Sequence, residues 1–437
     1  MDQTDLFGAV PQGQASPPAS SVPAQAAAPR VLRPNRQQMR FTPTDLESLL
    51  AEDHPARAIW AVVEKMDLSK FEATIAAREG HAGRPGIDPR ILVTLWIYAT
   101  SDGVGSAREV DRLQEMHHAY QWICGGVHVN HHSLSDFRVD HQEALDDLFT
   151  QILGVLMHHG LVDLKRVAQD GMKIRASAGA ASFRREKSLT QCLEEAREQV
   201  KEVAREAEAG EDVSLRRKAA QERAARERQD RVERALAELP KAREPKKEKD
   251  KAEARVSTTD AEARVMKMGD GGYRPAYNAQ FATDAKTRVI VGVDVTNSGS
   301  DMAQMPPMLQ NIDKRNGRLP AEHLVDGGYA KRESIEQATQ RGVTVYAPVQ
   351  KPKQEGVDPH QPKPNDSPEV SEWRTRMGTP EAKEIYKDRA ATAETTNADL
   401  RCNRALDRLR VRGLPKVGCV ILWAALTYNI LKLIAVA

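Results

Sequence analysis

The sequence is poor in cysteine and aromatic residues, two features that could by themselves indicate a class of protein. Only four cysteines occur in 437 residues (Cys124, Cys192, Cys402 and Cys419), and no two of them form a C-x-x-C pair. Such scattered thiols are typical of a reduced, cytosolic protein and predict neither a disulfide framework nor a structural zinc site. Aromatic residues make up 5% of the chain, but at this length an apolar content of 40% suffices for two or three domain cores.

A strong charge of one sign is also absent. The formal net charge is +2, although 29% of the residues are charged. The bulk balance therefore neither demands nor excludes a nucleic-acid partner, and any basic surface must be local. The N-terminus lacks the charged-then-apolar layout of a signal peptide. One long apolar run exists, VGCVILWAALTYNILKLIAVA, and Asn429 and Lys432 interrupt it, so we expect a buried core helix rather than a membrane anchor.

Changes of composition and apolar period divide the chain into segments. Residues 1–40 are rich in Ala, Pro, Gln and Ser and predict a disordered tail. Residues 41–160 have apolar residues at three- and four-residue steps and predict an all-α domain, one helix of which begins at the N-cap Asp88. Residues 161–437 mix period-two and helical patterns, which predicts an α/β sheet covered by helices. Within them, residues 186–255 are dense in Glu, Arg, Lys and Ala and predict a long, charged, coiled-coil-like helical insertion.

Two aspartates stand in segments that read as strands. Asp170 lies within KRVAQDGMKIRAS and Asp326 ends the short apolar run of HLVDGGYA, and glycine follows both. A carboxylate on a core strand is costly unless it is paired or binds a metal. Two adjacent carboxylates repel each other, so they need a proton or a cation between them, and such oxygen ligands suit Mg²⁺ or Mn²⁺. Two such ions, about 4 Å apart, would serve an in-line phosphoryl transfer.

A site of this kind needs a third carboxylate, and Glu394 in YKDRAATAETTNADLR is our choice. Upstream of it, Arg389 is suited to bind a phosphate bidentately and Tyr386 to donate a hydrogen bond to one. The residues alone leave alternatives open, because an aspartate before glycine is also a routine turn residue and a helical glutamate is usually just solvated. Asp163 and Asp294 compete for the same role.

Six segments, in their order and combination, resemble a DDE transposase of bacterial insertion sequences. They are GRPGIDPRILVTLWIYATSDGVGSARE, HHSLSDFR, RVAQDGMKIRASAG, YNAQFATDAKTRVIVGVDVTN, LVDGGYAKRES and YKDRAATAETTNADLR. The resemblance runs from about Phe41 to the C-terminus and implies an RNase H-like catalytic fold. It implies that Asp170 on the first strand, Asp326 after the fourth and Glu394 on a late helix are catalytic ligands of two Mg²⁺ (or Mn²⁺) ions. It also implies nicking of the element's ends and attack of the freed 3′-hydroxyl on target DNA, without a covalent enzyme intermediate.

Many relatives carry a Tyr-Arg-Glu-Lys signature around the catalytic glutamate. Tyr386, Arg389 and Glu394 match it in type, and Arg401 stands where the lysine would be. Four residues separate Arg389 from Glu394, whereas the commoner form has three. Arginine in place of lysine keeps the charge but changes the geometry. The resemblance thus predicts DNA contacts from Tyr386, Arg389 and Arg401.

Further DNA contacts are predicted from position in the chain. Trp373 lies between the last predicted strand and the Glu394 helix, where related enzymes place DNA-contacting residues. It would stack on an unpaired or flipped base, with core packing as the alternative. Lys351 and Lys353 lie in a loop suited to follow a DNA backbone.

The helical domain resembles the family's N-terminal domain, which is thought to recognise terminal inverted repeats. Its arginines are candidate phosphate contacts, each with an ordinary surface charge as the alternative. They are Arg84, Arg90, Arg108 and Arg138.

Three functions are compatible with the sequence. The first is an active DNA transposase, a cytoplasmic, nucleoid-associated enzyme that acts on element ends and target DNA as a homodimer in a synaptic complex, without a membrane. The second is a nuclease of other purpose or a catalytically decayed end-binding protein. The third is a non-enzymatic coiled-coil scaffold built on the arm at 186–255. The presence of all three acidic residues favours the first, because the loss of any one would disable the enzyme.

Overall fold

The structure is a computed structural model. It describes residues 45–436, apart from 78–79, 81–84, 209–214 and 353–355. The predicted disordered tail, and the candidate DNA contacts Arg84 and Lys353, lie outside the described residues.

The first part of the described chain is helical, as predicted. Its helices are α1 (Pro55–Val63), α2 (Ser69–Glu72), α3 (Pro89–Ser101), α4 (Ala107–Met116), α5 (His118–Cys124), α6 (His131–Asp140) and α7 (Gln142–His158). The N-cap prediction for α3 is confirmed, because the Asp88 side chain accepts a hydrogen bond from the backbone N–H of Arg90 at 2.8 Å. Pro89 follows as the first helical residue, where its missing N–H is not needed.

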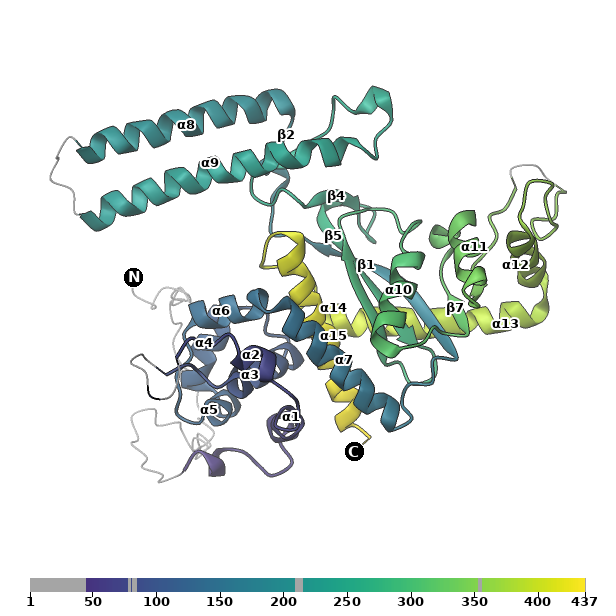
Figure 1. The fold of residues 1–437 in the computed structure, drawn as a ribbon, viewed down its shortest axis with the longest axis horizontal. Coiled ribbons are helices and arrows are strands. Elements are labelled where there is room, and N and C mark those ends of the chain that lie inside the picture. The colour runs from purple at the N-terminus through teal and green to yellow at the C-terminus, as the bar shows by residue number, and fades with distance from the viewer. Residues whose placement is uncertain (1–44, 78–79, 81–84, 209–214, 353–355, 437) are drawn as a thin grey trace, which may run out of the picture. The chain divides into compact units, whose positions relative to one another are not determined.

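A mixed sheet comes next in the chain, with β1 (Arg166–Arg175) as its central strand (Figure 1). β5 (Tyr273–Asp284) pairs with one edge of β1 in antiparallel fashion, and β7 (Glu322–Leu324) pairs with the other edge in parallel. Outside them lie β8 (Thr344–Tyr346), parallel to β7, and β6 (Ile290–Thr296) and β4 (Arg264–Lys267), both antiparallel to β5. This order and these directions are those of an RNase H-like sheet, as the sequence predicts.

Asp170 lies within a strand, as the sequence predicts. β1 continues through Gly171 to Arg175, and Asp170 lies opposite Phe281 in the middle of the β1–β5 ladder. Asp326, by contrast, follows the end of β7 as predicted. The ladder with the long strand β5 holds β1 extended past the glycine, an effect of tertiary pairing that local sequence does not reveal.

Helices cover the sheet. They are α10 (Met305–Asn316), α11 (Arg332–Gln340), α12 (Pro368–Gly378), α13 (Pro380–Arg389), a π-helical turn (Ala390–Glu394), α14 (Thr395–Asn403) and α15 (Leu414–Ile434). Helix α12 packs on α11 and β8 and contributes Val370 and Trp373 to a second hydrophobic core.

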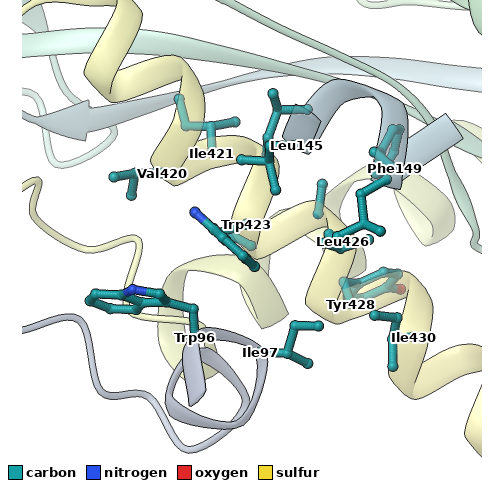
Figure 2. Packing of buried hydrophobic residues seen from close by; sticks show 14 of the residues in the cluster. Trp96, Ile97, Leu145, Phe149, Val420, Ile421, Trp423, Leu426, Tyr428 and Ile430 are labelled. Atoms are coloured by element: carbon teal, nitrogen blue, oxygen red, sulfur yellow. The ribbon is translucent and has the colours of Figure 1, made fainter. Parts of the chain in front are cut away.

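Helix α15 contains the long apolar run, and it is buried along most of its length, as predicted. By length and composition alone it could cross a membrane, but its surface packs against α3, α7 and β6 inside the protein (Figure 2). Asn429 is part of this packing: its side chain accepts from the Ile290 N–H at 2.9 Å and donates to the Ile290 carbonyl at 2.8 Å. The polar residue in the apolar run thus fastens the helix to a strand edge, whose backbone groups would otherwise be buried without partners.

The charged region contains two helices, α8 (Glu186–Glu208) and α9 (Leu215–Arg243), which pack along each other (Figure 1). Leu189, from the predicted apolar stripe, forms a small core with Ala235 and Leu239. Ion pairs join the two helices, among them Arg243–Glu186 at 2.7 Å. At the base of the pair lie the short strands β2 (Phe183–Arg184) and β3 (Val256–Ser257). That this region is an insertion into the catalytic fold stays a prediction, as does a domain boundary near residue 160.

We predict that Trp423→Ala lowers the free energy of unfolding by about 3–5 kcal/mol, because it removes a large side chain from a closely packed core. The Trp423 ring is 1% exposed, and its indole N–H donates to the Arg138 carbonyl at 3.1 Å. Urea unfolding followed by circular dichroism measures the change. Val155→Ala, on the exposed side of α7, is the control and should change stability little. Equal effects of the two substitutions would contradict the assignment of α15 to the core.

Candidate active site

The parallel pairing of β1 with β7 sets Asp170 and Asp326 side by side. Ala168 lies opposite Leu324 in that ladder, and each aspartate comes two residues later on its own strand or the turn after it. The guanidinium of Arg389, at the end of α13, lies between them: its Nη2 atom is 3.2 Å from Asp170 Oδ1 and 3.9 Å from Asp326 Oδ2. Two carboxylates from distant parts of the chain thus share one cation.

Asp170 is the more enclosed of the two carboxylates, with 20% of its side chain exposed. It accepts hydrogen bonds from the Gly171 N–H at 2.9 Å and from the Asn397 side-chain amide at 3.3 Å. Burial raises the pKa of Asp170, the charge of Arg389 opposes this shift, and the nearby carboxylates of Asp326 and Asp301 add to it. Because the pKa of Asp170 is raised, a further cation nearby would stabilise its ionised form.

Asp326 is more open, with 43% of its side chain exposed. Its Oδ1 atom accepts the Gly328 N–H at 2.6 Å and thereby caps the short 3₁₀ turn Gly327–Tyr329. The cap fixes one oxygen and leaves the other toward Arg389. The Gly-Gly pair after Asp326 therefore serves the turn that orients this carboxylate.

Glu394 lies outside the aspartate pair and is exposed. Burial lowers the pKa of Arg389, but the charges of Asp170, Tyr386, Asp326 and Glu394 outweigh burial, so the pKa of Arg389 is raised. The charge of Glu394 therefore acts on Arg389, but the ion pairs of Arg389 are with the two aspartates. Among the residues that the structure describes, no three His, Cys, Asp or Glu side chains are grouped closely enough to hold one metal ion. Catalytic and metal-binding roles for Glu394 stay predictions.

The unusual spacing between Arg389 and Glu394 has a structural counterpart. Residues Ala390–Glu394 form a π-helical turn between α13 and α14. In a π-turn the hydrogen-bonded residues are five apart rather than four, so it absorbs one extra residue without rotating the helix beyond it. Arg389 and Glu394, five residues apart, therefore lie one turn apart on one side of the helix, as the commoner spacing places them in an α-helix.

The residues predicted to contact DNA differ in how far they are exposed. Tyr386 is half-buried beside the second core and close to Arg389. Arg401 is exposed, with one N–H 3.4 Å from the Lys173 carbonyl, and Lys351 is exposed in its loop. Trp373 requires a correction, because it is only 3% exposed and its indole N–H donates to the Ala347 carbonyl at 3.2 Å. Its ring packs in the core and is not available to stack on a base.

A buried polar network on the other face of the sheet escaped the sequence interpretation. Successive strand residues face opposite sides, so Gly171 and its partner Gln280 face away from Asp170. Gln280 accepts from the Tyr329 hydroxyl at 2.6 Å and donates to Asp301 at 2.8 Å. Asn278 also donates to Asp301, at 2.6 Å. The signal was present in YNAQF, where Asn278 and Gln280 recur at period two within an apolar strand.

The competing aspartates are not part of the pair around Arg389. Asp163 accepts the N–H of Lys165 at 2.8 Å before β1 begins. Asp294, on β6, accepts the N–H of Val295 at 2.8 Å. Only Asp170 and Asp326, of the aspartates considered from sequence, converge on one cation. Their two carboxylates supply the hard oxygen ligands that a divalent ion such as Mg²⁺ prefers.

Comparison with protein families finds two transposase domains in the chain. Residues 232–430 match a family described as a transposase DDE domain, and residues 44–140 match one described as a transposase domain (DUF772). Asp326 and Glu394 lie within the first match, whereas Asp170 precedes it. No curated protein and no solved structure gave a match. Together the two matches indicate a DDE transposase of an insertion sequence.

We predict that Gly171→Ala destabilises the protein by about 1–3 kcal/mol, as overpacking typically does. A methyl group at this position would lie 2.5 Å from Gln280 Nε2 and 2.6 Å from Asp301 Oδ1. Chemical denaturation measures the effect. Gly154→Ala is the matched control, because nothing lies within 4 Å of a methyl group there and alanine favours the helix. Unchanged stability of Gly171→Ala would show that the side chains of Gln280 and Asp301 can move aside at little cost, and would contradict the prediction.

We also predict that deleting the exposed Ala391 preserves DNA cleavage, whereas inserting one alanine after it abolishes cleavage. Deletion lets the π-turn become an α-helical turn with Arg389 and Glu394 still on one side. Insertion rotates Glu394 by about 100° about the helix axis. Cleavage of DNA in Mg²⁺, with circular dichroism as the folding control, compares the two variants. An inactive, folded deletion variant would contradict the idea that the π-turn sets this register.

Proposed function

We propose that this transposase is an active enzyme that cuts DNA at the ends of its element and joins the freed ends to target DNA. The observation that carries the proposal is the convergence of Asp170 and Asp326 on the Arg389 guanidinium. Strand pairing and not local sequence creates this convergence, so it is unlike a pair of chance turn aspartates. Phosphoryl transfer needs positioning and charge stabilisation above all, and both require such a pre-formed charged site.

Asp170 and Asp326 would hold divalent metal, Mg²⁺ or Mn²⁺, with Glu394 as the third ligand in the proposed two-ion site. When bound, such ions supply activation of an attacking oxygen and stabilisation of a leaving oxygen. The fit rests on the chemistry of the donors, two carboxylates that already face one cation. Glu394 would have to approach from its exposed position near the same guanidinium.

The protein's own groups would position the reaction. The Asn397 amide and the Gly171 N–H hold the two oxygens of Asp170, and the Gly328 N–H holds Asp326. Arg389 has a planar fork of donors that matches a phosphate, and it already lies beside both carboxylates. Arg389 and Tyr386 would therefore orient the scissile phosphodiester, and Arg401, Lys351 and Lys353 would contact the backbone on either side.

The remaining parts of the chain fit a complex with two DNA ends. The helices within 41–160 would recognise the terminal repeats, and 161–437 would carry the catalysis. Cut-and-paste chemistry needs both ends together, so we propose a homodimer in the synaptic complex, acting on the nucleoid in the cytoplasm. The arm formed by α8 and α9 presents charges of both signs that are partly paired with each other, and a solvated role suits it better than DNA binding.

We predict that Asp170→Asn, Asp326→Asn and Glu394→Gln each abolish Mg²⁺-dependent cleavage, because each removes a ligand charge while keeping the side-chain shape. Binding to DNA should stay within a few-fold, since none of these groups attracts phosphate. The measurement is incubation of the purified protein with the DNA that flanks its own gene, followed by mapping of the strand products.

Asp294→Asn is the matched control, because Asp294 is a largely buried strand carboxylate away from Arg389, and it should retain cleavage. Full cleavage by any one of the three variants would remove that residue from the site. A wild-type protein that binds the ends without cutting them would identify the decayed, end-binding alternative.

A further inference from the structure

A second charged site lies away from the aspartate pair. A pocket of about 770 Å³ is bounded by the first turn of α4, by α6, by Ser177 after β1 and by residues 407–411. Four arginines line it: Arg108, Arg138, Arg408 and Arg410. Asp407 is the one carboxylate in the lining. Cations are therefore in excess in a concave site, where their fields add.

None of the four arginines has an ion-pair partner among the described residues. Elsewhere in the protein enclosed arginines do have carboxylate partners, such as Arg374 with Asp366 at 2.5 Å. Unpaired guanidinium groups gathered in one pocket repel each other. The arrangement is relieved when an anion binds among them.

Arg138 makes this argument strongest, because it is only 8% exposed. One terminal N–H donates to the Gly105 carbonyl at 2.8 Å, and the guanidinium carbon lies 4.5 Å from the centre of the Trp96 ring. Its buried Nε atom has no hydrogen-bond partner in the described part of the chain. Burial, with a smaller effect of Arg410, lowers the pKa of Arg138 to about 10, so the group remains charged at neutral pH. A buried, charged arginine without a carboxylate is costly.

The start of α4 adds donors to the same wall. Ser106 is the N-cap residue, but its side chain makes no capping hydrogen bond, and Glu109 pairs with Arg112. Gly105, Ser106, Ala107 and Arg108 all line the pocket. The free N–H groups and the positive end of a helix favour an anion there.

We propose that this pocket binds a backbone phosphate of the DNA substrate, and the proposal rests on the proposed function. Phosphate is the anion that a fork of arginines matches best. The lining contains no Phe, Tyr or Trp on which a base could stack, which favours a contact with the backbone over the binding of a free nucleotide.

The distance of the pocket from Asp170 determines which phosphate of the DNA the pocket would bind. Leu409 N–H donates to the Arg175 carbonyl at 2.8 Å, so the 407–411 segment is fastened to the end of β1. Asp170 lies five residues earlier on β1, which is about 17 Å along an extended strand. Successive phosphates of one DNA strand are about 3.4 Å apart along the helix axis. One turn of B-DNA spans about 34–36 Å, so the bound phosphate is expected within one helical turn of the cleaved one.

The test uses Arg108→Ala and Arg410→Ala, because both side chains are exposed and their loss should not unfold the protein. Binding is measured by fluorescence anisotropy in EDTA, over a range of KCl concentrations, with a duplex of the DNA that flanks the gene. Each variant should bind about tenfold more weakly. It should also show a salt dependence reduced by about one phosphate contact, to a similar extent on a random duplex. Arg318→Ala, an exposed arginine before β7 at the other end of the strand from Asp326, is the matched control and should bind as the wild type does.

Single neutral methylphosphonates, placed one by one from the mapped cut, locate the contact. The wild type should lose affinity for a duplex substituted at one position within a helical turn of the cut, and the two variants should be insensitive to that substitution. Wild-type binding and cleavage combined with unchanged affinity in Arg108→Ala and Arg410→Ala would overturn the pocket but not the proposed function. Failure of the wild type to bind any duplex would overturn both. Binding of inorganic phosphate that Arg410→Ala abolishes, without any change in DNA affinity, would assign the pocket to a free anion instead.

Discussion

The pairing of β1 with β5 on one edge and β7 on the other is the constraint on which the rest of the structure depends. It places Asp170 at the level of Asp326, through the parallel register of Ala168 with Leu324. It also carries β1 onward to Arg175, where the segment with Arg408 and Arg410 attaches. One extended strand thus joins the aspartate pair to the arginine pocket and fixes their separation. A slip of one residue in this register would turn Asp170 toward the opposite face and break both relations.

Charge balance explains why so polar a centre is stable. Asp170 is enclosed enough for its pKa to rise, and Arg389 supplies the compensating charge from the end of α13. The same guanidinium faces Asp326, and the charge of Glu394 also acts on it. The ion pairs of Arg389 with the two aspartates therefore hold the end of α13, which leads to the proposed third ligand, against the sheet. The π-turn after Arg389 then decides which side of that helix Glu394 occupies. The arginine pocket is the opposite case, because one carboxylate, Asp407, lines it beside four arginines that form no ion pair with the described residues. A bound anion would supply the missing charge.

Sequence reasoning works where the signal is local. The cap at Asp88, the burial of the C-terminal helix and the presence of strands β5 and β6 all follow from residue types and spacings that act over a few residues. It fails where distant parts of the chain decide. Trp373 is predicted to contact DNA, with core packing as the alternative, and the structure places it in the second core. The network around Gln280 escapes sequence reasoning for the same reason, because its three partners lie on β1, in the loop at Asp301 and in the turn at Tyr329.

By itself the sequence determined the resemblance to a family, the helical and α/β halves, and two candidate metal-binding aspartates, because composition, period and motif order are properties of the chain alone. Only the tertiary structure decided that those aspartates share the Arg389 guanidinium and that a π-turn absorbs the extra residue before Glu394. It also decided that four arginines from three segments gather in one pocket with a single carboxylate. Distances between residues far apart in the chain depend on strand register and helix packing, and no window of sequence contains both partners.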